Sequence, residues 1–247
     1  MSGVSVVVPV FNGAESVRVL AGRLAAVLPC VAERFEVVLV NDGSADGSWR
    51  VIEELAELHP WVRGVDLTRN YGQQAATLCG IRLARHELVV TMDDDLEHPP
   101  EAIPALLRRL GEGHDVVYGT APPRHRGWAR GVGRAVMRPA LFGALGPEAV
   151  RELTSLRAFR VGLRDEFGGV ERRPILIDLL LARGAHRVAF EPVEFGARRS
   201  GRSGYSLGKL LAGSLHLLVR ARVSGGRGVA YAVRAETGLP ARTGGAN

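Results

Sequence analysis

Short apolar runs alternate along the first half of the chain with longer segments whose apolar residues recur every three or four positions. The short runs are rich in valine and leucine and predict buried strands, whereas the longer segments have the period of a helix face. The predicted strands are Val4–Pro9, Phe35–Val40, Val62–Leu67, Leu88–Met92 and Asp115–Tyr118. The predicted helices cover residues 17–28, 48–58, 72–84 and 99–110. This alternation indicates an α/β fold with a mainly parallel sheet and helices on both of its faces.

The second half of the chain is less regular. Its pattern predicts a helix near residues 128–144, a strand near 153–159, a helix near 173–183 and a strand near 187–194. Residues 223–247 are rich in glycine, arginine and alanine, which predicts a mobile tail. We therefore expect a single domain over residues 1–222, with residues 1–119 and 120–222 as its two halves.

Polar segments follow the first, second and fourth predicted strands, at Phe11–Gly13, Asn41–Ser44 and Asp93–Asp95. In a parallel sheet such segments meet beyond the carboxyl ends of the strands, where ligands bind. Three consecutive carboxylates beside a core repel one another unless a cation or hydrogen-bond donors compensate. Asp93 and Asp95 face the same way on an extended chain, and carboxylates are the usual ligands of Mg²⁺ and Mn²⁺. A divalent-cation and phosphate site is the first hypothesis, and a solvated acidic turn is the alternative.

The positive charge of the chain is concentrated in two segments. The net charge is +6, yet residues 120–138 alone carry five arginines and no acid. Residues 196–209 carry three arginines, one lysine and no acid. Segments of this kind favour an anionic ligand or an acidic membrane surface. No nucleic-acid-binding motif accompanies them, so we do not expect nucleic acid as a partner.

The cysteine content and the length of the apolar runs limit where the protein acts. Two cysteines are too few for a disulfide framework and indicate a reducing compartment. We find no secretory signal, and no apolar run approaches the roughly 20 residues that span a bilayer. We expect a cytoplasmic protein, with peripheral contact to the inner face of the membrane as an open possibility.

Six motifs carry a resemblance to a known family that covers about residues 4–212. Four of them resemble family 2 glycosyltransferases of the GT-A fold, a Rossmann-like nucleotide-diphospho-sugar transferase fold: Val7–Asn12, Val40–Ser48, Arg69–Ala76 and Met92–Glu101. Two later motifs resemble the branch of dolichyl-phosphate mannose synthase and the bacterial polyprenyl-phosphate glycosyltransferases: Thr154–Arg157 and Arg199–Lys209. Each motif alone is moderately specific, whereas all of them in this order are very specific.

The resemblance implies that the first two motifs hold a nucleotide. Pro9, Phe11 and Glu15 would surround the base and ribose, and Asp42 would bond the base. The chemistry agrees, because a carboxylate accepts hydrogen bonds from a base N–H or a ribose hydroxyl. The alternative for Asn41–Ser44 is an ordinary turn.

The resemblance also assigns the acidic cluster. Asp93 and Asp95 match the Asp-x-Asp of the family, so that Asp93 would face the sugar and ribose and Asp95 would bind Mg²⁺ or Mn²⁺. Glu97 stands where the lipid-phosphate branch often has glutamine, and it would add a carboxylate beside the metal. The alternative for Glu97 is an acid that favours the start of a helix. Asp94 points the other way and is expected to be structural.

Arginines are implied to bind the acceptor. The candidates are Arg124, Arg126, Arg130 and Arg157, which would grip an acceptor phosphate. For the residues between 126 and 138 the alternative is a solvated helix face, because the arginines there recur every four positions.

Two further groups complete the expected site. Arg199, Ser203 and Lys209 fit a loop that closes over the donor diphosphate, although Lys209 also reads as an ordinary surface lysine. Asp178 lies in an apolar helical segment, where a buried carboxylate needs a partner or a function. It is a candidate general base if the acceptor is an alcohol, and a capping or salt-bridged aspartate otherwise.

Together these features predict a metal-dependent inverting glycosyltransferase. Residues 1–119 would bind a UDP- or GDP-linked sugar, and residues 120–222 would bind the acceptor. Polyprenyl phosphate at a membrane surface is the expected acceptor, and a soluble hydroxyl compound such as a secondary metabolite is the alternative. A non-catalytic nucleotide-sugar-binding subunit is the alternative from another class, although an intact Asp-x-Asp speaks against it.

Overall fold

The computed structural model describes residues 3–121, 153–167, 177–196 and 231–238 of the 247-residue chain. The helix expected near residues 128–144 lies outside these ranges.

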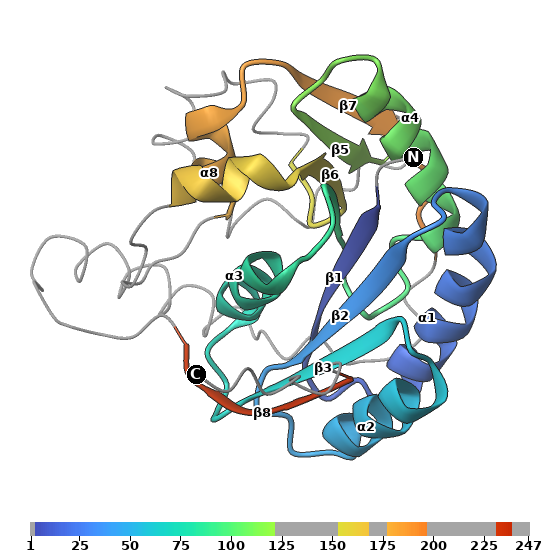
Figure 1. Cartoon of the computed structure of the whole chain (residues 1–247), viewed down its shortest axis with the longest axis vertical. Helices are drawn as coiled ribbons and strands as arrows, with labels where there is room; N and C mark the ends of the chain where they lie inside the picture. Colours follow the sequence, from blue (N-terminus) through green and yellow to red (C-terminus); the bar gives the residue numbers. More distant parts are fainter. Residues whose placement is uncertain (1–2, 122–152, 168–176, 197–230, 239–247) are drawn as a thin grey trace, which may run out of the picture.

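The described residues form an eight-stranded sheet with the order β7-β5-β6-β4-β1-β2-β3-β8 (Figure 1). The strands are β1 Val4–Val10, β2 Phe35–Asn41, β3 Val62–Leu67, β4 Leu88–Thr91, β5 Val116–Thr120, β6 Arg157–Arg160, β7 Val188–Pro192 and β8 Val233–Thr237. The pairs β1–β2, β1–β4, β2–β3 and β5–β7 are parallel. Only β6 and β8 run antiparallel to their neighbours among these strands. The expected mainly parallel sheet is confirmed.

Helices cover both faces of this sheet. Their bounds are α1 Ala14–Val27, α2 Ser48–Leu58, α3 Gln73–Leu83, α4 Ile103–Gly111 and α8 Ile177–Gly184, with 3-10 turns η1 Leu28–Cys30, η2 Pro100–Ala102 and η5 Val161–Phe167. Figure 1 shows α1, α2 and α4 on one face, and α3 and α8 on the other. The core is correspondingly divided into two clusters on either side of the strands.

Strand β1 shows why the apolar runs of the sequence are nearly continuous. Val6 and Val8 pack into the cluster that contains α1, α2 and α4, whereas Val7 packs into the cluster that contains α3. Successive side chains of a strand point to opposite faces, so a strand covered on both faces must be apolar at nearly every position. The alternation of apolar and polar residues that is typical of a half-buried strand is therefore absent from the sequence, and only the short length of the apolar run indicates a strand.

The second half of the chain differs in detail from its prediction. The strand expected near residues 153–159 is β6 at Arg157–Arg160, and the residues before it form a connection at the site. The helix expected near 173–183 is described from Ile177 to Gly184, and the strand near 187–194 shortens to Val188–Pro192. Arg157 is buried within the sheet and forms an ion pair with Asp178, a tertiary contact that the local pattern does not reveal.

The prediction of a mobile tail over residues 223–247 is wrong for Val233–Thr237, which form β8. This strand pairs antiparallel with β3, and Arg234 adds an ion pair to Asp66 at 3.3 Å. The outer edge of β3 would otherwise present unpaired backbone N–H and C=O groups. An edge strand exposes its charged side chains, and so β8 lacks the apolar run by which the other strands were found.

One edge of the sheet gathers the polar connections. Strands β1 to β4 are parallel and end there, and β5 and β7 run in the same direction. Strands β6 and β8 run the opposite way and begin there. Described residues near either end of the segments 122–152 and 197–230 also lie at this edge, at Ala121, Ser155, Gly196 and Ala232.

Candidate active site

The acidic turn begins directly after β4, at the centre of this edge. Asp93, Asp94 and Asp95 are each partly buried, and the Oδ1 atom of Asp95 accepts a hydrogen bond of 3.0 Å from the backbone N–H of Glu97. Leu96, between them and buried, has a φ of +63°. A leucine rarely adopts this left-handed conformation, so the surrounding structure must enforce the turn. The strained turn holds the acids in one arrangement.

Asp93 is held by hydrogen bonds to both of its carboxylate oxygens. The side-chain amide of Gln73 donates to Oδ1, and the Ser155 hydroxyl donates to Oδ2 at 2.7 Å. Burial raises the pKa of Asp93, and repulsion from Asp95 adds to this, whereas attraction to His98 and the Ser155 bond act in the opposite direction. A carboxylate with a raised pKa that is aimed by two donors is typical of a functional site.

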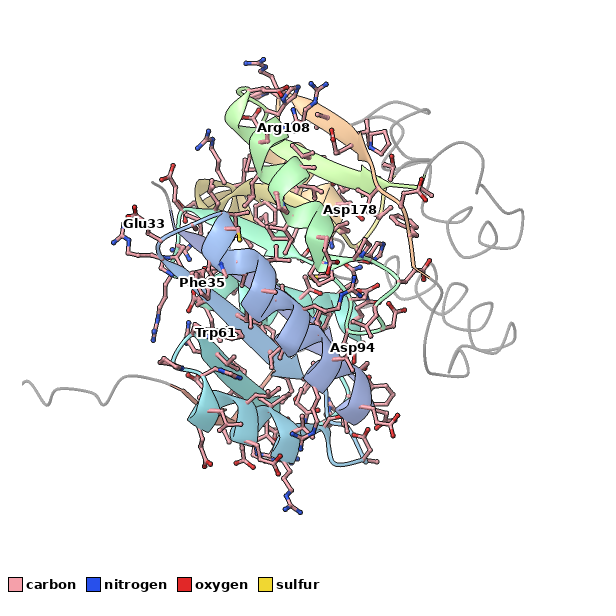
Figure 2. All side chains as sticks on the ribbon, turned by 90° about the vertical axis from the view of Figure 1, so that its right-hand side faces the viewer. Glu33, Phe35, Trp61, Asp94, Arg108 and Asp178 are labelled. Carbon is pink, nitrogen blue, oxygen red and sulfur yellow. The ribbon has the colours of Figure 1, made fainter. Side chains whose placement is uncertain are left out.

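Asp94 lies close to the start of α1. A side chain at Gly13 would collide with the carboxylate of Asp94, so this acid lies against the residue that precedes α1. A negative charge is favourable at a helix N-terminus because of the helix dipole. Figure 2 shows Asp94 on the side of the molecule opposite to Phe35 and Trp61, which lie at the other end of the strands.

The acidic turn is also joined to the segment that follows β7. The backbone N–H of Gly196 donates to the carbonyl oxygen of Glu97 at 2.9 Å. The ring of His98 packs edge-on against Phe195, with centroids 4.8 Å apart. His98 is only 6% exposed, and its Nδ1 atom has no hydrogen-bond partner in the described part of the chain. His98 thus joins the acidic turn to the segment before residue 197.

The loops after β1 and β2 are locked to each other. Asn12 has a φ of +52°, and its backbone N–H donates to the Ser44 hydroxyl at 2.9 Å. The Asn12 side-chain oxygen accepts from the backbone N–H of Ala45, also at 2.9 Å. Asparagine tolerates this conformation because its side chain bonds nearby backbone. The two expected nucleotide motifs therefore form one surface.

Asp46 ties this surface to the starts of two helices. Its carboxylate accepts from the backbone N–H of Ser48 at 3.0 Å and from that of Ala14 at 3.3 Å. Burial acts to raise the pKa of Asp46, but these bonds and that from the Ser48 hydroxyl outweigh it, so the pKa is lowered. An ionised acid between the N-termini of α1 and α2 stabilises both helices.

Asp42 has an internal role that the sequence did not indicate. It is only 2% exposed, and its two oxygens accept from the backbone N–H groups of Tyr71 at 2.6 Å and Gly72 at 2.8 Å. These groups lie at the start of α3, so Asp42 fixes that helix to the loop after β2. A bond from Asp42 to a nucleotide base stays a prediction.

The other predicted nucleotide residues lie around these loops. Pro9 is buried within β1, Phe11 is 50% exposed immediately after it, and Glu15 is exposed in the first turn of α1. Phe11 therefore presents an open aromatic face at the edge, whereas Pro9 shapes the strand below it. Their contacts with a nucleotide remain predictions.

Gly43 cannot be replaced without moving these loops. Its φ is +65°, and an added Cβ would overlap the backbone of Arg69 and Asn70. We expect Gly43→Ala to weaken nucleoside diphosphate binding about tenfold and to lower the free energy of unfolding by about 1–3 kcal/mol, because both strain and overlap must be relieved. Calorimetric titration and urea unfolding measure the two effects. Gly47→Ala in the same loop is the matched control, since its Cβ would meet nothing. Equal behaviour of the two variants would contradict the close approach at Gly43.

The residues predicted to bind a metal supply the right chemistry but not a complete site. Asp95 and Glu97 offer carboxylate oxygens, which suit Mg²⁺ or Mn²⁺. Within the described ranges no group of three or more His, Cys, Asp and Glu side chains could hold a metal ion. Mg²⁺ typically takes one or two protein carboxylates and completes its shell with water and substrate phosphates. The residues therefore fit a metal that arrives with a phosphorylated ligand.

Asp178 forms an ion pair with Arg157, as expected for a salt-bridged aspartate, which was the alternative to a general base. Both Arg157 and the hydroxyl of Tyr118 donate to its Oδ1 atom, the latter at 3.2 Å. The Arg157 side chain is only 2% exposed, and its Nε atom donates to the Thr91 hydroxyl at 3.0 Å. An acceptor contact by Arg157 would require this pair to open. Its role in acceptor binding, and that of Asp178 as a base, stay predictions.

The remaining predicted residues lie outside the described part of the chain. These are Arg124, Arg126, Arg130, Arg199, Ser203 and Lys209. The segments that contain them are flanked by described residues at the edge of the acidic turn. A role of these residues in the site of the acidic turn requires that their segments start and end near it.

Gln73, Ser155 and Thr91 were not identified from the sequence. Gln73 and Ser155 lie within motifs that carried the resemblance. However, Gln73 is 20 residues and Ser155 is 62 residues away from Asp93 in the sequence, so their contacts with it could not be read from the motifs. In the sequence Thr91 is an ordinary β-branched strand residue. Its hydroxyl forms hydrogen bonds with Ser155 and Arg157, which lie beside it only in the folded protein. The motifs were the one signal that could have marked the first two.

The comparisons with known proteins agree with this geometry. A family model described as "Glycosyl transferase family 2" matches residues 5–161. The chain belongs to this family. A relative from Aeromonas hydrophila subsp. hydrophila, named undecaprenyl-phosphate 4-deoxy-4-formamido-L-arabinose transferase, is 34% identical over 209 residues. The match covers 84% of this chain and 64% of the relative, so this family 2 glycosyltransferase spans less than two thirds of the relative's length.

Solved structures confirm the GT-A fold. Mannosyltransferase PcManGT from Pyrobaculum calidifontis, solved in complex with GDP-Man and Mn²⁺, superposes with a TM-score of 0.63 at 21% sequence identity. The superposition covers 92% of this chain and 66% of the mannosyltransferase chain. Glucosyl-3-phosphoglycerate synthase from Mycobacterium tuberculosis, in complex with Mn²⁺, UDP and phosphoglyceric acid, has a TM-score of 0.62 at 21% identity, with coverages of 90% and 78%. At this identity the likeness concerns the fold.

Among the helices that the structure describes in this glycosyltransferase, none has both the length and the apolar content needed to cross a bilayer.

Proposed function

We propose that this family 2 glycosyltransferase moves a sugar from a UDP- or GDP-linked donor to polyprenyl phosphate at a membrane surface. The observation that carries the proposal is the meeting of the Asp93–Asp95 turn with the loops after β1 and β2 at one edge of the sheet. Ligands of open α/β sheets bind at such an edge. Residues 1–119 would hold the donor, and residues 120–222 the acceptor.

The donor would lie along the loops after β1 and β2. The exposed ring of Phe11 would contact the base, with Glu15 near the ribose and Asp42 and Pro9 shaping the floor of the site. Asp95, assisted by Glu97, would hold Mg²⁺ or Mn²⁺ beside the diphosphate. When bound, the metal neutralises the charge that develops on the leaving diphosphate.

The acceptor would approach from the side of residues 120–222. Arg124, Arg126 and Arg130 would bind its phosphate, since guanidinium groups match phosphate oxygens in pairs. Arg199, Ser203 and Lys209 would close over the donor diphosphate. An anionic phosphate oxygen attacks the sugar in line with the leaving group and inverts its configuration, so little help from a base is needed. The name of the Aeromonas relative supports a lipid phosphate, as do the two basic segments.

A soluble hydroxyl acceptor is the second candidate. The observation that favours it is Asp178, a partly exposed carboxylate in the first turn of α8. A hydroxyl must lose its proton during transfer, and a carboxylate can accept it. This candidate requires that Asp178 serve the acceptor despite its pair with Arg157.

The acceptor is tested by incubating the protein and Mn²⁺ with a panel of UDP- and GDP-sugars. Nucleotide release is measured with polyprenyl phosphate in detergent, with polyprenol, and without acceptor. We expect release with one donor to rise at least about tenfold with polyprenyl phosphate only, because the basic segments recognise a phosphate. Equal stimulation by polyprenol would contradict the phosphate acceptor and favour a hydroxyl.

A peripheral location is tested by sedimentation with anionic and neutral vesicles.

A further inference from the structure

The Asp93 carboxylate is fixed from two sides by parts of the chain that are far apart in sequence. Gln73 is the first residue of α3, and Ser155 lies in the connection before β6. An ionised carboxylate can only accept hydrogen bonds, so both partners must act as donors. Within the described part of the chain each oxygen receives one donor, which leaves a lone pair on each for a ligand.

The Gln73 donor is itself held in place by the expected nucleotide loop. Asp42 binds the backbone N–H groups of Tyr71 and Gly72, which immediately precede Gln73. A shift of the loop after β2 would therefore move the start of α3, and Gln73 with it. The position of Asp93 is thus joined to the loop that is expected to bind the nucleotide.

The Ser155 donor is held by a chain of polar contacts inside the sheet. The Thr91 hydroxyl donates to the carbonyl oxygen of Ser155 at 2.7 Å and accepts from the Nε atom of Arg157 at 3.0 Å. Arg157 in turn is paired with Asp178. Thr91 and Arg157 are buried, and a buried polar network of this kind restricts its members to one arrangement. Ser155 is therefore a rigid partner.

We propose that Gln73 and Ser155 are positioning residues that aim the Asp93 carboxylate at the hydroxyl groups of the donor sugar. This inference rests on the proposed function. In it Asp178 serves as the anchor of Arg157, and through Arg157 and Thr91 it supports Ser155. Neither positioning residue has to touch the reacting atoms, because each acts through Asp93.

The place of Asp93 between its neighbours identifies the sugar as the part that it meets. Asp95, two residues on, is the expected site of the metal and the diphosphate. Ser155, on the other side, belongs to the half expected to bind the acceptor. The transferred sugar must lie between the diphosphate and the acceptor, which is where Asp93 is held. A carboxylate binds sugar hydroxyls well because it accepts charge-assisted hydrogen bonds.

The test compares the binding of nucleotide sugars with that of the nucleoside diphosphates that lack the sugar. Calorimetric titrations in Mn²⁺ use the pairs UDP-glucose and UDP, and GDP-mannose and GDP, on the full chain. We expect Gln73→Glu and Ser155→Ala each to weaken nucleotide-sugar binding about tenfold relative to the nucleoside diphosphate, because a hydrogen bond to a charged group is lost. Nucleoside diphosphate affinity should stay within about twofold, and kcat should fall with the loss of sugar binding.

Two matched variants separate positioning from a merely structural role. Ser155→Thr keeps the hydroxyl and should retain the wild-type ratio of affinities. Gln74→Ala removes the neighbouring glutamine, which contacts the backbone of Ile177 and not Asp93, and should also retain it. Wild-type ratios in Gln73→Glu and Ser155→Ala would overturn the proposal, as would equal losses for nucleotide sugar and nucleoside diphosphate. If the unaltered protein binds neither pair, the proposed function itself fails, and the positioning role with it.

Discussion

Replacement of Asp95 with alanine is expected to lower sugar transfer about a thousand-fold and to leave the fold intact. The variant removes the carboxylate expected to hold the metal, and with it several kcal/mol of charge stabilisation on the leaving diphosphate, where each 1.4 kcal/mol or so is tenfold in rate. Asp95 is only partly buried, so folding should be little affected. Nucleotide release in Mn²⁺, together with the urea midpoint, measures both quantities.

The neighbouring acid provides the control for this variant. Asp94→Asn keeps the size of a side chain that lies against the start of α1. It should lose a few tenths to about 1 kcal/mol of stability and keep most of the activity. If the Asp94 and Asp95 variants lose transfer equally, or if the wild-type protein stays fully active in EDTA, the metal role of Asp95 is wrong.

Replacement of Arg63 with alanine is expected to have the opposite pattern, a large loss of stability with little change in transfer by the folded molecules. Arg63 forms an ion pair of 2.8 Å with Glu36, and the two side chains are only 5% and 6% exposed. The variant leaves Glu36 as a buried charge with no guanidinium partner, which costs about 3–5 kcal/mol. The pair lies near the ends of β2 and β3 that are remote from the acidic turn. Urea unfolding followed by circular dichroism measures the loss.

An apolar double variant is the matched control for the Arg63 prediction. Glu36→Leu with Arg63→Met removes both charges, and it should lose clearly less stability than Arg63→Ala alone. A loss below about 1 kcal/mol in Arg63→Ala would show that the pair contributes as little as an exposed one.

The same ion pair predicts how stability depends on pH. Burial acts to raise the pKa of Glu36, but hydrogen bonds from Arg63, Ser5 and the backbone of Arg85 outweigh it, so the folded pKa lies below the ordinary value of 4.5. A lowered folded pKa stabilises the fold at pH values above 4.5 and loses that contribution as the pH falls through the folded value. The wild-type protein should therefore lose more stability on acidification than the double variant.

The sheet could be predicted where strands are buried on both faces, and not where they lie at its edge. The valine-rich run of β1 is a clear signal because α1 and α3 cover its two sides. In β8 the charged residues Arg234 and Glu236 alternate with valine, alanine and threonine, since β8 is the last strand of the described sheet and several of its residues are exposed. The position of β8 is determined by its pairing with the edge of β3, a tertiary contact that cannot be predicted from the sequence of β8 alone.

The candidate site divides in the same way. Asp93 and Asp95 were identified because adjacent acids after a buried strand are unusual in any fold. Their partners Gln73 and Ser155 are ordinary residue types, and only folding brings them to Asp93. Asp178 was correctly singled out as a carboxylate that needs a partner, but nothing in its local sequence pointed to Arg157.

A metal–diphosphate site at the acidic turn is tested most directly by a calorimetric titration of UDP and GDP into the wild-type protein and into Asp95→Ala, each with Mn²⁺ and with EDTA. If the acidic turn holds a metal–diphosphate, wild-type protein should bind one of the two nucleotides at least about tenfold more tightly with Mn²⁺, because Asp95 would hold the cation and the cation would offset the charge of the phosphates. Asp95→Ala should show no such difference. Binding of equal strength in Mn²⁺ and in EDTA, or an undiminished effect of Mn²⁺ in the variant, would contradict a metal site at Asp95.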